Sequence, residues 1–303
     1  MVGNKPADFR RLSFSVHVLL FLLLFNSLNA TAQLKDSLSV NKKRLKVFAI
    51  GSGVAYGASL IGLSQLWYKN AEQQSFRFFN DNAEWKQVDK LGHFYAAFYL
   101  SYGTSQSLRW CNVPAKRSDL AGALTGFFVM LPIEIFDGFS DAYGASSGDL
   151  VANAAGASFF FGQKRLWNEV RIRPKFSFHR TGYAALRPEV LGDNVPGEIL
   201  KDYNGQTYWL TADVDKFISF PKWLDIAVGY GAQGMVYARD AQSRLAGYDQ
   251  YRQYYLSLDV DLTAIRTRSK VVKTLIFIVN SIKIPAPAIE FSRKKMSFHP
   301  LYF

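Results

Sequence analysis

The stretch from Pro132 to Gly156, PIEIFDGFSDAYGASSGDLVANAAG, places carboxylates inside and beside apolar, glycine-rich sequence. These carboxylates belong to Glu134, Asp137, Asp141 and Asp149. Glu134 stands in the run from Leu120 to Phe136, which carries no other charge. An isolated buried charge is unfavourable by several kcal/mol, so this carboxylate must be paired, protonated or in contact with water. The glycines and serines that follow predict a polar turn where two helix ends meet.

Apolar runs with cap and proline signals predict four helices, over residues 47–68, 90–110, 119–137 and 148–170. The first contains 22 residues without a charge and is long enough to cross a bilayer. Its glycines at 51, 53, 57 and 62 predict close packing against another helix, and a core helix of a soluble bundle is the alternative. Asp89 is the expected N-cap of the second helix, and Pro132 is expected to kink the third. Short links predict an up-down-up-down bundle.

Such a bundle brings three polar pairs to one end. Asp89 and His93 are spaced i, i+4, as are Asp149 and Asn153, and Glu134 and Asp137 are spaced i, i+3. One imidazole among carboxylate oxygens suits a divalent metal ion, with Asp89, His93, Glu134 and Asp149 as candidate ligands. The same end can instead hold a catalytic acid–base set of His93, Glu134 and Asp137. Asp89, Asp149 and Asn153 would then support it.

Simpler roles for these residues stay open. Asp89, and Asp149 with Ser147, can cap helices whose N-termini favour negative charge. His93 can be a core histidine that is hydrogen-bonded to Glu134 and holds two helices together. Three bonded polar pairs would then specify how the bundle packs. The opposite end of the bundle is basic, with lysines and arginines near residues 42–46, 116–117 and 164–165.

The N-terminal segment has the features of a secretory signal. Two arginines precede an apolar run, and Ala30-Thr31-Ala32 forms a cleavage site, although an uncleaved anchor is the alternative. We therefore divide the chain into a signal peptide (1–32), a polar basic arm (33–46), a helical bundle (47–173) and a β-rich region (174–303). Cys111 is the only cysteine, which excludes an intrachain disulfide and a cysteine metal cluster.

The C-terminal region shows the period-two alternation of strands. Strands are expected over residues 206–214, 224–237 and 254–264, with a short helix over 270–280 and an extended edge over 283–287. We expect a small antiparallel sheet docked on the basic end of the bundle. The aromatic last residue, Phe303, also resembles that of outer-membrane barrels, which need at least eight strands.

The net charge of +12 is spread along the chain. Without basic clusters on a recognisable nucleic-acid-binding fold, nucleic acid is not an expected partner. The expected partner is membrane lipid or another envelope component, because anionic lipid attracts a basic, aromatic-rich protein. With the signal removed, the basic end would face the periplasm. Inner-membrane proteins instead carry their excess of lysine and arginine on the cytoplasmic side. The outer membrane is therefore favoured over the inner membrane.

Two motifs carry a family resemblance. Asp89-Lys90-Leu91-Gly92-His93-Phe94 and Asp149-Leu150-Val151-Ala152-Asn153-Ala154-Ala155-Gly156 resemble those of the YfiM-type predicted periplasmic lipoprotein group, a domain of unknown function, and of the VanZ-like membrane family. The resemblance covers residues 45 to 170. LRPEVLG and KDYNGQTYWL also resemble the C-terminal extension of Bacteroidetes members. The lipoprotein cysteine is missing, and Asp137 stands where VanZ-like proteins carry glutamine.

The sequence therefore predicts an α+β protein, a membrane-associated four-helix up-down bundle followed by a small antiparallel β-rich region. Its expected role is structural or lipid-interacting in the cell envelope. The alternative is a hydrolase or transferase, metal-assisted or not, that acts on an amphiphilic envelope component. No G-x-S-x-G, P-loop, dinucleotide fingerprint or H-E-x-x-H motif occurs. The oligomeric state is left open.

Overall fold

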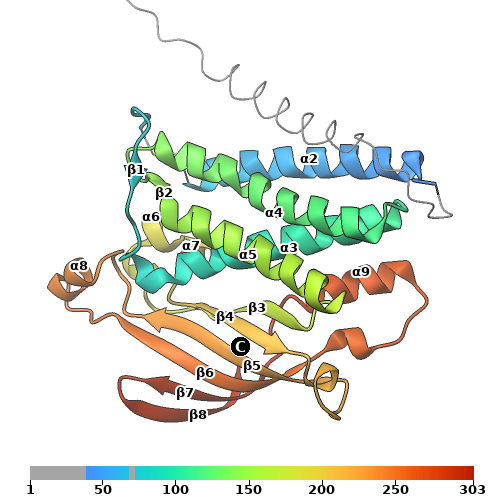
Figure 1. Ribbon diagram of the computed structural model, residues 1–303. Coiled ribbons are helices and arrows are strands. Elements are labelled where there is room, and N and C mark those ends of the chain that lie inside the picture. Colours follow the sequence, from blue (N-terminus) through green and yellow to red (C-terminus); the bar gives the residue numbers. More distant parts are fainter. Residues whose placement is uncertain (1–38, 68–71) are drawn as a thin grey trace, which may run out of the picture. The chain divides into compact units, whose positions relative to one another are not determined.

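The computed structural model describes residues 39–67 and 72–303 (Figure 1). Its longer helices are α2 (Lys42–Trp67), α3 (Val88–Trp110), α4 (Ala115–Gly138), α5 (Ser147–Trp167) and α9 (Lys270–Val279), and its shorter ones are α6 (Pro188–Leu191), α7 (Val195–Lys201) and α8 (Asp240–Leu245). Its strands are β1 (Phe78–Phe79), β2 (Ala145–Ser146), β3 (Ile172–Phe178), β4 (Gln206–Ala212), β5 (Leu224–Gln233), β6 (Tyr251–Val260), β7 (Ala286–Ser292) and β8 (Lys295–Tyr302). Residues 40–303 form one compact unit. The expected signal peptide lies outside the described residues.

Helices α3, α4 and α5 pack closely because small residues stand where the backbones meet. A Cβ atom added at Gly126 of α4 would lie 2.0 Å from Ser101 Oγ of α3. One added at Gly156 of α5 would lie 2.2 Å from the carbonyl oxygen of Phe94. At the far end of α3, Asp119 of α4 accepts hydrogen bonds from Ser105 and Arg109. These three helices form the packed part of the helical layer.

Helix α2 lies alongside this group with little of its surface covered. Tyr56 donates a hydrogen bond to the Val129 carbonyl of α4, and Arg44 donates one to the Trp110 carbonyl. Nothing described lies within 4 Å of a Cβ added at any of the α2 glycines (51, 53, 57 and 62). The prediction that these glycines mediate close helix packing is therefore wrong, and α4 and α5 use glycine in that way instead.

The six longer strands form one antiparallel sheet in the order β3-β4-β5-β6-β7-β8. Figure 1 shows this sheet on one side of the helices, with its strands running roughly along the helix axes. Helix α3 contacts it directly, because Tyr95 donates a hydrogen bond to the Ser281 carbonyl and Tyr99 donates one to the Pro174 carbonyl. The sheet is curled, since Tyr302 of β8 reaches both Thr207 of β4 and Tyr255 of β6.

The inner face of the curled sheet combines polar side chains with a buried cluster around Trp209 and Tyr255, and its outer face is apolar. Along β6, Tyr254, Leu256 and Leu258 point outward, whereas Ser257 and Asp259 point inward. Asp259 is 0% exposed, whereas Leu256 is 44% exposed. The expected alternation is present, and its polar side is the buried one. This is the reverse of the usual arrangement of an antiparallel sheet with one face in water.

Paired charges fill the interior of the sheet. Lys175 Nζ lies 2.6 Å from Asp259 Oδ2, and Lys283 Nζ lies 3.7 Å from Asp259 Oδ1, with all three side chains fully buried. Lys283 also donates to the carbonyls of Leu258 and Ile284, and Lys175 donates to Asn280 Oδ1. Two lysines therefore share one carboxylate, which offsets part of the cost of removing them from water, and burial lowers the pKa of Lys283 to about 8.

The α+β fold class is confirmed, and a four-helix membrane bundle remains a proposal. Helices α3, α4 and α5 lie within a few residues of their predicted ranges, and α4 continues through Pro132 to Gly138. The sheet lies along the side of α3, where Tyr208 approaches Gly92, rather than at the basic end. Strands β3 and β8 were not predicted. Residues 286–292 form β7, which pairs on both sides instead of forming an edge.

We expect Asp259→Asn to lower the free energy of unfolding by about 3–5 kcal/mol, because it leaves Lys175 and Lys283 buried without their shared carboxylate. Denaturant unfolding of the detergent-solubilised protein, followed by circular dichroism, measures this. The control is Asp249→Asn, whose ion pair with Arg244 is exposed and should contribute no more than about 1 kcal/mol. Equal losses in the two variants would contradict a buried charge network.

Candidate functional site

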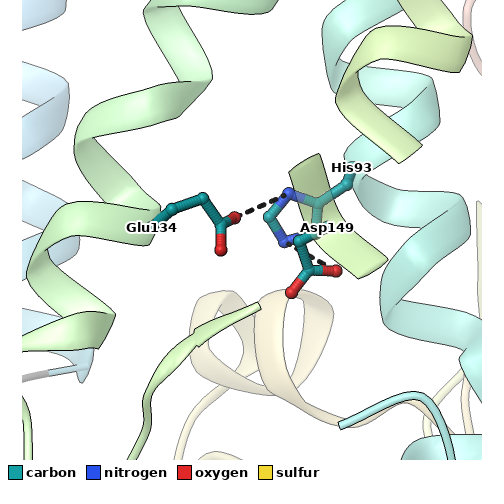
Figure 2. A group of neighbouring side chains, drawn as sticks. All are labelled: His93, Glu134 and Asp149. Atoms are coloured by element: carbon teal, nitrogen blue, oxygen red, sulfur yellow. Dashed lines mark ion pairs between the residues drawn. The ribbon is translucent and has the colours of Figure 1, made fainter. Parts of the chain in front are cut away.

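The acid–histidine cluster forms where the first turns of α3 and α5 meet the last turns of α4. Helix α3 supplies Asp89, Lys90 and His93, α4 supplies Glu134, and α5 supplies Asp149 and Asn153. Figure 2 shows the His93 ring between Glu134 and Asp149. The structure thus brings together the predicted site residues Asp89, His93, Glu134, Asp149 and Asn153.

His93 is flanked by carboxylates that it does not contact at hydrogen-bonding distance. Its Nδ1 lies 3.6 Å from Glu134 Oε1, and its Nε2 lies 3.7 Å from Asp149 Oδ1 (Figure 2). The hydrogen-bonding partner of Nδ1 is Asn153 Oδ1, at 3.2 Å. The direct His93–Glu134 hydrogen bond considered from the sequence is therefore replaced by a link from α3 to α5. Both separations exceed hydrogen-bond length only slightly, and they leave no room for a water between the ring and either acid.

Lys90 is the centre of the second half of the cluster. Its Nζ lies 2.6 Å from Asp81, 2.9 Å from Asp89 and 2.8 Å from Asp149. Asp81 comes from the segment between β1 and α3, so the ammonium group joins three separate parts of the chain. Ser146 extends the network by donating to Asp81 and by accepting from the backbone N–H of Asp149.

Sequence reasoning missed the roles of Lys90, Asp81 and Ser146. Lys90 follows Asp89 in the quoted motif, and an uncompensated group of acids is itself a signal for a nearby cation. Asp81 lies in an aromatic connector, and its position in the sequence gave no such signal.

The capping predictions need correction. Gln87 occupies the cap position of α3 in a left-handed conformation (φ 63°), and Asp89 lies inside the first turn. Ser146, and not Ser147, caps α5 through its side chain. Asp89 is therefore an ion-pair partner of Lys90 more than a helix cap, which explains why it can be buried.

Burial raises the pKa of two acids of the cluster, Glu134 and Asp89. It raises the pKa of Glu134 from 4.5 to about 8, and the neighbouring charge of Asp149 acts in the same direction. It likewise raises the pKa of Asp89 to about 6. Half-buried Asp137, one turn beyond Glu134, takes part through its charge, which adds to the rise in the pKa of Glu134.

The pKa values of the two bases, His93 and Lys90, shift in opposite directions in the cluster. Burial lowers the pKa of His93, although Asp149 opposes this. Burial also acts to lower the pKa of Lys90, but Asp89 and Asp149 outweigh it, and the pKa of Lys90 is raised. At neutral pH the cluster therefore holds a charged lysine, a neutral imidazole and a protonated Glu134.

The predicted metal ligands divide between two groups. One oxygen each of Asp81, Asp89 and Asp149 lie within 4.8 Å of one another, but the Lys90 ammonium already lies among them. His93, Glu134 and Asp149 form the other group, also within 4.8 Å. An ion bound there would compete with Lys90 for Asp149, whose Oδ1 lies 2.8 Å from the Lys90 ammonium. A metal at this second group remains a prediction.

Comparison with known proteins gives one result. Residues 77–162 match the family described as predicted periplasmic lipoprotein (DUF2279), and the match includes every residue of the cluster. No curated protein and no solved structure matches the chain. The family match supports a periplasm-facing location in the cell envelope. It does not bear on the YfiM-type relation, the Bacteroidetes origin or the VanZ-like motifs, and it does not resolve outer from inner membrane.

The raised pKa of Glu134 has a consequence for stability. The folded protein binds this proton more tightly than the unfolded chain, so the stabilisation is complete below pH 4.5 and is lost as the pH rises through about 8. We expect the free energy of unfolding to fall between pH 6.5 and 8.5. This range lies above the pKa of Asp89, about 6, so titration of Asp89 contributes little to the fall. Glu134→Gln should flatten this dependence, as measured by denaturant unfolding at each pH.

The matched control for this measurement is Glu189→Gln, because the Glu189 carboxylate is exposed beside Arg187. In that variant, the free energy of unfolding should depend on pH as it does in the unmodified protein. If the free energy of unfolding of Glu134→Gln still fell over this pH range, a group other than Glu134 would be the one that takes up the proton.

Proposed function

We propose that this chain is a membrane-associated protein of the cell envelope with a structural, lipid-contacting role, and that the acid–histidine cluster holds its helices together. Helix α2 carries this proposal. Two described helices are long and apolar enough to cross a membrane, over Lys42–Gln65 and Ala115–Gly138. One third of the second window is buried, as in a core helix, whereas none of the first is.

The exposure of α2 is what distinguishes it from a core helix. Val47, Ile50, Val54 and Ile61 are exposed, and Val54 is 69% exposed. An apolar surface of this length in water is unfavourable in proportion to its area. Lipid hydrocarbon removes that penalty, and the tryptophan and lysines at its two ends suit the membrane–water interface. Lipid contact is therefore the environment that the helix fits best.

The cluster supports a structural role. Its ion pairs and hydrogen bonds join α3, α4, α5 and the segment that contains Asp81, with little access from solvent. The Glu134 side chain is 4% exposed and the His93 side chain 18%. Buried polar networks of this kind can specify one arrangement of helices.

The outer membrane is the site that we favour within the envelope. If the signal peptide is removed as expected, the basic end of the helices faces the periplasm. Proteins of the inner membrane instead carry their excess of lysine and arginine on the cytoplasmic side. The periplasm-facing location of the matched family is compatible with this orientation.

A second candidate function is acid–base catalysis on an amphiphilic envelope component. Glu134, with a pKa raised to about 8, is a proton donor near neutral pH, and the neutral His93 ring beside it is a proton acceptor. A strain that lacks the protein can be complemented with Glu134→Gln or His93→Ala, and its envelope lipids profiled. Loss of complementation at unchanged abundance and stability would favour the enzyme, and loss through unfolding would favour the structural role.

We expect the chain from residue 33 to require detergent and to float with liposomes. The triple variant Ile50→Asn, Val54→Asn, Ile61→Asn should float much less, because each amide would lie against hydrocarbon. Leu245→Asn on α8, at a site that is 91% exposed, is the control and should float like the unmodified chain. A soluble monomer without detergent would end the proposal.

A further inference from the structure

The outer face of the curled sheet carries a second apolar surface, beyond the part at Tyr208 and Tyr230 that the start of α3 covers. Ile226 and Val228 of β5 and Leu256 and Leu258 of β6 are exposed on it. On β7 and β8, Phe291 and Phe298 are exposed as well. Exposed apolar patches of this extent mark interaction sites.

The strand register joins these side chains into one band. Val228 pairs with Leu256, Leu256 pairs with Ile289, and Ile289 pairs with Phe298. Directly paired residues project from the same face of a sheet. Two residues further along these strands, Tyr254 pairs with Phe291 and projects from the same face. The apolar band therefore runs without interruption from β5 to β8.

We propose that this band lies against the hydrocarbon of a lipid bilayer, an inference that rests on the proposed membrane association. The interior of the sheet has no room for the apolar side chains, because the Lys175–Asp259 ion pair and the packed Trp209 and Tyr255 rings already fill it. The polar face is inward and the apolar face outward, which is the distribution that a lipid environment favours.

The shape of the surface favours lipid over a second copy of the chain. The contacts of Tyr302 with Thr207 and Tyr255 inside the curl make the outer face convex. Two convex faces touch over a small area, whereas a stable protein interface needs a broad, complementary fit. Lipid chains adapt to a curved surface, so they cover the whole band.

The ends of the band carry side chains suited to the membrane–water interface. Strands β5 and β6 have ten residues each, a length that crosses a hydrocarbon core. Trp223 and Lys222 lie at one end of the pair, and Tyr254 and Arg252 lie near the other. Aromatic rings and basic groups gather at the borders of a bilayer.

Fluorescence quenching tests this placement on the chain from residue 33. In a Cys111→Ala background without other cysteines, single cysteines replace Val228 or Leu256 on the band, Val54 on α2, and Leu245 on α8 as the control. Each is labelled with an environment-sensitive fluorophore, and the protein is reconstituted in phosphatidylcholine vesicles with and without nitroxide-labelled lipid. Tyr254→Cys, also exposed on the band, replaces any band variant that fails to fold.

We expect nitroxide lipid to quench the labels at 228 and 256 several-fold more than the label at 245. Quenching at 54 but not at 228 or 256 would overturn this inference and leave the proposed membrane association standing. Absence of quenching at all of these positions would overturn both. Blue-shifted but unquenched labels on the band would show a protein cover, such as a second copy, and would also overturn the inference.

Discussion

The position of one ammonium group constrains the helical half of the molecule. Lys90 lies within ion-pair distance of Asp81, Asp89 and Asp149, which come from three parts of the chain. Without a cation between them, three partly buried carboxylates would repel one another, and their desolvation would have no compensation. The arrangement of α3 and α5 therefore depends on this contact. The His93 ring, one turn after Lys90, takes its place beside Glu134 and Asp149 as a result.

The two halves of the structure use the same principle at different sites. In the helical layer, charged groups gather at the ends where α3, α4 and α5 meet, and in the sheet they fill the inside of the curl. Apolar side chains lie outside in both halves, on α2 and on the outer face of β5 to β8. Buried clusters around Phe98 and Phe160 in the helices and around Trp209 and Tyr255 in the sheet pack beside these polar contacts.

Much of the helical half could be predicted from the sequence, because apolar runs and the spacing of Asp89, His93, Asp149 and Asn153 are local signals. The ion pairs of Lys90 were not predictable in this way, since they depend on how segments far apart in the chain meet. Strand β3 was missed because Arg173, Pro174 and Lys175 resemble a polar linker until the interior that receives them is known. Alternation along β6 predicted a strand but not which of its faces would be buried.

The charges inside the sheet also bear on how the protein folds. Lys175 of β3 donates to the Val260 carbonyl at the end of β6, 85 residues later, and Lys283 reaches the same region from beyond α9. Until both lysines and Asp259 are together, each partial sheet lacks part of this ion-pair network, and closing such long loops is entropically unfavourable. Few stable intermediates are then available to the sheet. Its strands should form in a single late and cooperative step, after the locally encoded helices.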